Sequence, residues 1–372
     1  MAFDRREFLA AGVAAANAAF AQVAAQPSAA GPGIPGPWPG RVASVHHPGS
    51  FVSNAYQAEP VAAMMERGMC ELTGAPASAE AWRTLFKSGD VVGIKLNPVG
   101  FPHIVSAPEV LRPIIEGLSH AGIKRRDIVV YDRYRDQFLR AGFDKWLPEG
   151  VRWMAASEKY LDVQLDMDGY DRDVYMEMPL VNPAYSSHYA LSDSHPRRSY
   201  VAKFLTKEVN KLVNLCVLKH HQAAGVTLAL KNLSHGCVNN VNRSHVSNTA
   251  NVTGSFIPAV VDRPAFREKV VLNILDGIRA AWHGGPGGKT GKYLWKHHTL
   301  YFATDPVALD KTGWKAIDAR RAEVGRPPIA LLKPDADSTR LNCQVEHIEL
   351  AGNIGLGVFD DSKIDLRQIR LT

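Results

Sequence analysis

The hydrophobic pattern of the first third of the chain predicts a strand, a helix and a second strand. Residues 89–97 (GDVVGIKLN) form a short, β-branched apolar run, which is typical of a buried strand. After a capping box of Ser106 and Glu109, apolar side chains recur at three- and four-residue spacing, which predicts an amphipathic helix over 106–122. Residues 127–131 (DIVVY) predict the next strand. The order is that of a parallel βαβ unit. The predicted fold class is therefore α/β, with a parallel or mixed sheet built from such units, in one domain or in two lobes around a cleft.

Polar side chains follow both predicted strands, where ligands bind in open parallel sheets. The first strand leads into 97–103, which offers an amide from Asn97 and an imidazole from His103. Asp132 follows the second strand and begins a segment of carboxylate and guanidinium groups. We predict that His103 and Asp132 are catalytic. The alternative is that two polar loops merely close the sheet.

The segment 219–245 has the highest density of reactive side chains. It holds four histidines, two lysines, one cysteine and four asparagines around the apolar run VTLAL. The preceding run 212–218 predicts a strand, which places His220 and His221 at its carboxyl end. Histidine titrates near neutrality, and its neutral imidazole is the commonest metal ligand. We predict that His221 is catalytic and that this segment supplies metal ligands. The predicted ligands are His220, His221, His235 and His245.

Two alternatives stay open for this segment. Its spacing matches no zinc-finger or HExxH motif, and each histidine could be a hydrogen-bonded group of the core or of a loop. A lysine that is desolvated beside apolar residues can act as a base or a nucleophile, which makes the lysines of the segment candidates as well.

A glycine-rich loop at 283–292 (HGGPGGKTGK) predicts a mobile segment over a cleft. We predict that Gly285 and Gly287 contact a cofactor there. The preceding run VVLNILDGI predicts a strand that ends at Asp276, whose carboxylate could face the same cleft. Asp305, before a proline, is expected to cap the helix that follows.

The chain start has the features of an export signal. Arg5 and Arg6 precede Phe-Leu and an alanine-rich run that ends near residue 25, which matches a twin-arginine signal peptide. We predict a signal peptide at 1–25, a Pro/Gly-rich linker at 26–40 and an α/β domain at 41–372, in which 143–198 is a candidate insertion. The predicted location is periplasmic or otherwise extracytoplasmic, and the twin-arginine export machinery is a predicted partner.

Composition narrows the class of protein. The formal net charge of +6 is modest, and no basic run is interleaved with aromatic residues, so nucleic acid is not expected as a partner. The alanine-rich run is too short for a good transmembrane helix, so an integral membrane protein is not expected. The four cysteines stand singly, without a CxxC motif, so no iron–sulfur cluster motif is encoded.

Several segments together resemble the bacterial and archaeal family known as domain of unknown function 362. They occur in the family's order and span about 89–357. Many relatives carry an added ferredoxin module, which the cysteine pattern of this chain does not provide. The segments are VVGIKLN, APEVLRPIIEGLSHAGI, DIVVYD, VNLCVLKHHQAAGVTLALKN, LDGIRAAWHGGPGG, FATDPVALD and HIELAGNIGLG.

The chain is also distantly similar to the nickel-pincer lactate racemases. His221, Lys231 and His245 follow one another at spacings of ten and fourteen residues, comparable to those of that family. The resemblance implies that Lys231 and His245 contact a cofactor, and we predict the same of the adjacent Asn232. It also implies that His221 moves a proton, with His103 or Asp132 as the second proton-transferring group.

We therefore predict an exported, metal- or cofactor-assisted enzyme that performs acid–base or redox chemistry on a small polar substrate. The identity of the cofactor is not predicted, and a metal ion is a candidate. One alternative is a non-catalytic periplasmic protein that binds a metal or a small ligand with the same histidines. Another is a structural module in which these histidines are hydrogen-bonded core groups.

Overall fold

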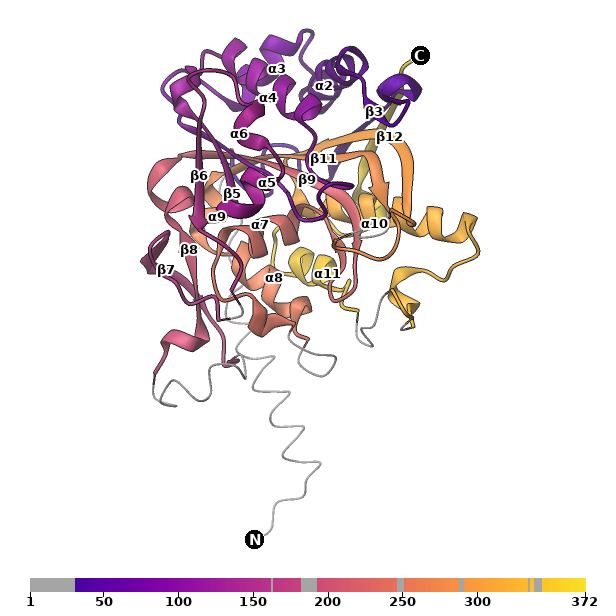
Figure 1. The fold of residues 1–372 in the computed structure, drawn as a ribbon. Coiled ribbons are helices and arrows are strands. Elements are labelled where there is room, and N and C mark those ends of the chain that lie inside the picture. Colours follow the sequence, from indigo (N-terminus) through magenta and orange to yellow (C-terminus); the bar gives the residue numbers. More distant parts are fainter. Residues whose placement is uncertain are drawn as a thin grey trace. The chain divides into compact units, whose positions relative to one another are not determined.

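Strands and helices alternate along the chain (Figure 1). The computed structural model describes residues 31–161, 163–181, 193–245, 251–287, 291–333, 335–337 and 343–372, and the predicted signal peptide at 1–25 lies outside them. The strands are β1 (Arg41–His46), β2 (Phe51–Val52), β3 (Ala55–Tyr56), β4 (Val92–Lys95), β5 (Ile128–Tyr134), β6 (Arg152–Ser157), β7 (Tyr170–Glu177), β8 (Arg198–Ala202), β9 (Lys211–His221), β10 (Gly225–Thr227), β11 (Val270–Ala281), β12 (Leu294–Ala303) and β13 (Asp365–Arg370).

The helices lie mostly between these strands. The α-helices are α2 (Ala58–Thr73), α3 (Ser78–Leu85), α4 (Pro108–His120), α5 (Arg135–Arg140), α6 (Phe143–Trp146), α7 (Ala229–Cys237), α8 (Thr253–Val261), α9 (Pro264–Lys269), α10 (Pro306–Glu323) and α11 (His347–Asn353). The shorter helical turns are η1 (Pro48–Ser50), η2 (Arg125–Asp127), η4 (His195–Arg197), η5 (Phe204–Glu208, a π-turn), η6 (Asn242–Ser244), η7 (Ile329–Leu331) and η8 (Asp361–Lys363).

One mixed sheet forms the centre of the fold. Within the described residues it has nine strands, in the order β13-β1-β12-β11-β9-β4-β5-β6, with β10 paired to β9. The strands β11, β9, β4, β5 and β6 are parallel to their neighbours in this series, whereas β12 is antiparallel to both β11 and β1. The α/β class is confirmed, as is the parallel pairing of the first two predicted strands, β4 and β5.

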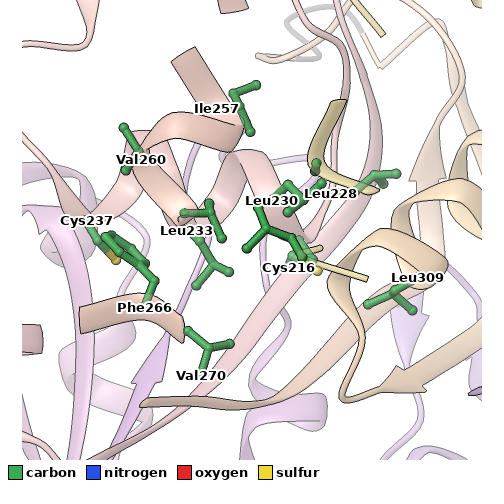
Figure 2. Close-up of a cluster of buried hydrophobic side chains, with 14 of the residues drawn as sticks. Cys216, Leu228, Leu230, Leu233, Cys237, Ile257, Val260, Phe266, Val270 and Leu309 are labelled. Atoms are coloured by element: carbon green, nitrogen blue, oxygen red, sulfur yellow. The ribbon is translucent and has the colours of Figure 1, made fainter. Parts of the chain in front are cut away.

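Two hydrophobic layers sandwich the sheet. Helices α2, α3 and α4 cover one face, and α7, α8, α10 and α11 lie on the other (Figure 1). The alternation along β9 serves both layers, because Val213 and Leu215 pack on the first face and Leu212 and Cys216 on the second. Figure 2 shows the second layer around α7, in which Leu230 and Leu233 of the helix lie in one cluster with the buried side chains of Ile257, Val260 and Leu309. This apolar contact fixes α7 against the sheet.

Several boundaries differ from the sequence-based prediction. The run VTLAL is not one element, because β10 ends at Thr227 and α7 begins at Ala229. The predicted capping box is wrong, because α4 begins at Pro108 without a side-chain cap. The Ser106 hydroxyl instead accepts from the Asn97 N–H (2.9 Å) and donates to a carbonyl of β9, so it ties the start of the helix to the sheet.

The domain boundaries also differ. Gly31–Thr372 forms one compact unit and not two lobes. Ile34 is buried and its N–H donates to the Arg267 carbonyl (2.8 Å), so the second half of the predicted linker belongs to the folded domain. Within the candidate insertion at 143–198, β6 is an edge strand of the main sheet, and the separate two-stranded sheet of β7 and β8 comes after it.

Candidate functional site

A pocket of about 240 Å³ lies at the carboxyl ends of β4, β5 and β9. From the boundary between β4 and β9, the chain adds β5 and β6 on one side and β11 and β12 on the other. Such a boundary is the topological switch point at which open α/β sheets bind ligands. Six of the predicted site residues line this pocket, and they are Asp132, His221, Lys231, Asn232, His235 and His245.

A buried ion pair forms the floor of the pocket. The Lys95 ammonium, from the last residue of β4, donates to Asp132 Oδ1 at 2.6 Å, and the two side chains are 2% and 5% exposed. Asp132 lies within β5 and not beyond it, because the strand continues to Tyr134. The carboxylate predicted to be catalytic is therefore engaged as the counter-ion of a lysine.

Amide side chains form a second buried network. Asn232 accepts through its oxygen from the Asn97 amide (3.1 Å) and donates to the Asn214 oxygen (2.8 Å), and Asn214 in turn donates to Asn273 (2.9 Å). These bonds connect four polar side chains, which come from the segment after β4 and from α7, β9 and β11. Asn232, predicted as a cofactor contact, thus has both ends of its amide engaged in joining α7 to the sheet.

His221 is fixed in one tautomer at the end of β9. Its Nδ1 accepts from the backbone N–H groups of Ala223 and Ala224, both at 3.1 Å. An atom that accepts two N–H groups carries no proton, so the neutral ring carries its hydrogen on Nε2. Burial, and then the nearby charge of Lys231, hold the pKa of His221 well below 6.5. His221 is therefore a neutral hydrogen-bond donor to the pocket.

Two further histidines share a serine. The Ser244 hydroxyl donates to the Val241 carbonyl (2.7 Å), so its oxygen accepts from both neighbouring rings: His235 Nε2 at 3.1 Å and His245 Nδ1 at 2.9 Å. His235 Nδ1 lies 3.0 Å from the Ser234 hydroxyl, so both of its nitrogens have partners. In His245 this arrangement leaves Nε2 as the nitrogen that bears a lone pair.

Lys231 is the most unusual group of the pocket. It is 7% exposed, and no hydrogen bond or ion pair to its amino group is found among the described residues. It lies in the first turn of α7, where the helix dipole disfavours a cation. Burial, and then the charge of Arg133, lower the pKa of Lys231 from 10.5 to about 7. A large share of this amine is therefore neutral at neutral pH.

Arg133 and Gln164 also line the pocket. The guanidinium of Arg133 is buried and donates to the Tyr170 hydroxyl (3.2 Å), the His235 carbonyl (3.4 Å) and Gln164 Oε1 (3.1 Å). Gln164 Oε1 also accepts from the N–H of Val241 (2.9 Å), which orients the amide. Its Nε2 is buried and has no partner among the described residues.

Some predicted site residues lie elsewhere. His103 does not line the pocket, and its Nδ1 lies 3.3 Å from Arg279. His220 points away from the other three histidines toward His283, with ring centroids 5.0 Å apart. Asp276 lies inside β11, which runs on to Ala281, and its carboxylate accepts from Tyr56 instead of facing the pocket.

The glycine loop contributes less than predicted. Pro286 lines the pocket, but Gly285 and Gly287 do not. A side chain at Gly285 would meet the His220 carbonyl at 1.7 Å, so close packing against β9 explains this glycine. Asp305 caps α10 as expected, accepting from the N–H groups of Val307 and Ala308.

Three of the predicted metal ligands line the same pocket, since the ring of His245 lies 5.8 Å from that of His221 and 5.3 Å from that of His235 between centroids, whereas His220 lies outside it. Among the described residues no group of three or more His, Cys, Asp or Glu side chains is arranged to hold a metal ion. The hydrogen bonds give a chemical reason, because Nε2 of His221 carries a proton and both nitrogens of His235 are engaged. Cys70, Cys216, Cys237 and Cys343 are free thiols.

Three pocket residues were missed in the sequence. Lys95 could have been recognised in the sequence, because a lysine within the apolar run VVGIKL must have an ionic partner or a function if the strand is buried. Arg133 would follow from extending the strand DIVVY to DIVVYDRY. Gln164 gives no signal, because it comes from a segment without regular structure.

The fold and the pocket define an α/β protein with a pocket at a switch point, lined by several charged and polar side chains. The sequence profile of the family described as domain of unknown function (DUF362) matches residues 92–315, from the first residue of β4 into α10. The chain belongs to this family, which confirms the predicted family resemblance. All of the pocket residues lie within the matched range.

Other comparisons add little. A crystal structure of a protein from Thermotoga maritima matches with 13% identity and a TM-score of 0.36, over 68% of this chain and 60% of that protein. No curated protein matches the chain. Among the described residues, no helix combines the length and the apolar character that crossing a bilayer requires.

Proposed function

We propose that the protein is an enzyme that moves a proton on a small polar substrate, with the Lys231 amine as the base. The observation that carries this proposal is the buried amino group of Lys231, which has no partner among the described residues and a pKa of about 7. A base is most effective when its pKa lies near the working pH. The pocket volume of about 240 Å³ suits a small molecule.

His221 has the complementary role. Its Nε2–H donates to a substrate oxygen, because Nδ1 is held by two backbone N–H groups. If Lys231 removes a proton from a carbon next to a carbonyl, negative charge develops on the carbonyl oxygen, and a neutral imidazole N–H stabilises it. Lys231 takes the proton and His221 keeps its own.

A metal or another cofactor remains outside this proposal. The resemblance to the nickel-pincer racemases concerns His221, Lys231 and His245, of which His221 and His245 lie with ring centroids 5.8 Å apart. The engaged nitrogens of His221 and His235 do not fit a histidine-based metal site, so no step is routed through a metal.

Exchange of substrate hydrogen for deuterium tests the proposal without knowledge of the product. The protein is incubated in D₂O with a panel of small carbonyl compounds and oxo acids, and loss of C–H signals is followed by NMR. We expect exchange that Lys231→Met abolishes and that Lys315→Met, which removes an exposed lysine, leaves unchanged. Equal exchange in Lys231→Met would contradict the assignment of Lys231 as the base, and no exchange across the panel would favour the alternative, a non-catalytic ligand-binding protein.

We also propose that the chain is exported by the twin-arginine route. The support is the sequence Arg5-Arg6-Glu7-Phe8-Leu9 and the alanine-rich run after it. Fractionation of the producing cells should find the processed chain outside the cytoplasm, and Arg5→Lys with Arg6→Lys should retain the precursor inside. Export that is unchanged by both substitutions would contradict the route.

A further inference from the structure

We propose that the ligand of this pocket carries a small oxyanion, a carboxylate or a phosphate group, which Arg133, Gln164 and Lys231 bind. This inference deepens the proposed function and rests on the same pocket. It concerns what the substrate must carry, whereas the proton transfer concerns what happens to it.

The charges of the pocket are unbalanced. Lys95, Arg133 and Lys231 line it, and Asp132 is the single carboxylate in the lining formed by described residues. Asp132 is paired with Lys95 at 2.6 Å. Arg133 and Lys231 have no carboxylate partner among the described residues, and both are at least nine-tenths buried. A buried guanidinium without a counter-ion is costly, and a bound anion would supply that counter-ion to Arg133, and to Lys231 whenever its amine is protonated.

The unsatisfied hydrogen-bond donors of the pocket also favour a bound anion. Nε2 of Gln164 is buried and has no acceptor among the described residues, although its Oε1 receives three donors. Of the five N–H groups of a guanidinium, Arg133 uses three in the bonds described above, which leaves two. The Nε2–H of His221 adds a further donor.

The pocket offers few acceptors in return. Its remaining orphaned side-chain atoms are Gln137 Oε1, which only accepts, and the hydroxyls of Tyr134 and Thr227, which can either donate or accept. A neutral amide offers one acceptor oxygen and an amine a single lone pair, and both bring donors of their own, so either one satisfies fewer of the donors of Arg133, Gln164 and His221. An oxyanion brings several lone pairs on one small group and matches all of these donors at once.

The anion also fits the chemistry. When Lys231 accepts a proton from the substrate it becomes an ammonium close to Arg133, whose charge already disfavours that state. A carboxylate or phosphate beside both groups offsets the new charge. A substrate that carries its own anion therefore assists the transfer of its proton to this lysine.

Calorimetric titration tests the inference. Full-length protein is titrated with pyruvate, acetate and inorganic phosphate, and with pyruvamide and acetamide as neutral isosteres. We expect at least one of the three anions to bind and the amides to bind at least about tenfold more weakly. Binding of phosphate without the carboxylates, or the reverse, identifies the kind of anion. Amides that bind as tightly as the anions, or no binding of any anion, would overturn the inference.

Variants connect the binding to the named residues. Gln164→Leu and Arg133→Gln should each weaken the anion by roughly 10-fold or more, because each removes a donor to it. Arg152→Gln, which removes a partly exposed arginine of the edge strand β6, should have no effect. If Arg133→Gln does not fold, Gln164→Leu alone decides, and unchanged affinity in that variant contradicts the assignment.

The two proposals fail separately. Anion binding without any Lys231-dependent deuterium exchange would overturn the enzymatic proposal and leave the anion site in place. Exchange on a neutral ketone, in a protein that binds no anion, would overturn the anion site and leave the base in place.

Discussion

Replacement of Lys231 by methionine should change how the stability of the protein depends on pH. The pKa of Lys231 is about 7 in the folded protein and 10.5 in an unfolded chain. Between these values the unfolded state binds more protons, so the free energy of unfolding rises with pH. The difference of 3.5 units corresponds to roughly 5 kcal/mol, at about 1.36 kcal/mol for each unit.

The direction of this pH dependence follows from the protonation state in which the folded protein buries Lys231. Below pH 7 the folded protein must hold a buried ammonium that has no partner in the described part of the chain, and the full penalty applies. Above pH 10.5 both states hold the neutral amine and the penalty disappears. Methionine has a similar length and no charge, so Lys231→Met should be more stable than the wild type at pH 6 to 7.

Urea denaturation at pH 6, 7, 8, 9 and 10 measures the effect. The stability of the wild type minus that of Lys231→Met should rise by about 1.4 kcal/mol for each pH unit above 7. Lys315→Met, which removes a lysine that is 61% exposed, is the matched control and should give a flat difference. A flat difference for Lys231→Met as well would refute the claim that the fold lowers the pKa of this lysine.

Three further predictions follow from the surroundings of the pocket. Lys95→Met should destabilise the protein by about 3–5 kcal/mol in urea denaturation, because it leaves the Asp132 carboxylate buried without its partner. The double variant Lys95→Met with Asp132→Leu should regain much of that lost stability. A larger loss of stability in the double variant would contradict the explanation. Asp310→Ala should lower the free energy of unfolding by about 1–3 kcal/mol. The Asp310 carboxylate accepts from the N–H groups of Ala229 (2.7 Å) and Leu230 (3.0 Å), so it caps α7 from the neighbouring helix α10. Unchanged stability would show that this cap is dispensable. In ¹⁵N NMR of the imidazoles, His221 should remain neutral to a pH well below 6.5, because burial and the charge of Lys231 lower its pKa. Its proton should be on Nε2, because Nδ1 accepts from two backbone N–H groups. A proton on Nδ1 at neutral pH would contradict the assignment of His221 as a donor to the pocket.

The arrangement of strands and the region of the site could be predicted from the sequence. Apolar periodicity identified β4, α4 and β5, and the rule on strand ends directed attention to Asp132 and His221. Lys231 was predicted as a site residue because it follows an apolar run within a segment rich in histidine and asparagine, and it lies in the pocket. These features depend on local patterns that a single segment carries.

The remaining parts depend on contacts between distant segments. His103 was expected in the site, but the Lys219 ammonium binds the Asn97 side chain (2.9 Å) and the carbonyls of Val99 and Ile104. This anchor sets the course of the loop, and His103 lies outside the pocket. No local pattern could predict it, because the lysine is more than a hundred residues away. The tautomers of the histidines were likewise beyond prediction, since Ser244 and two backbone N–H groups decide them.

The central claim is that Lys231 is a neutral base at physiological pH, and an NMR titration of its side chain tests it most directly. Protein with isotopically labelled lysine is titrated from pH 5 to 11, and the Lys231 signal is assigned by its absence in Lys231→Met. We predict a midpoint near 7, as burial beside Arg133 requires. A Lys231 signal that titrates near 10.5, with the exposed lysines, would contradict the proposed base.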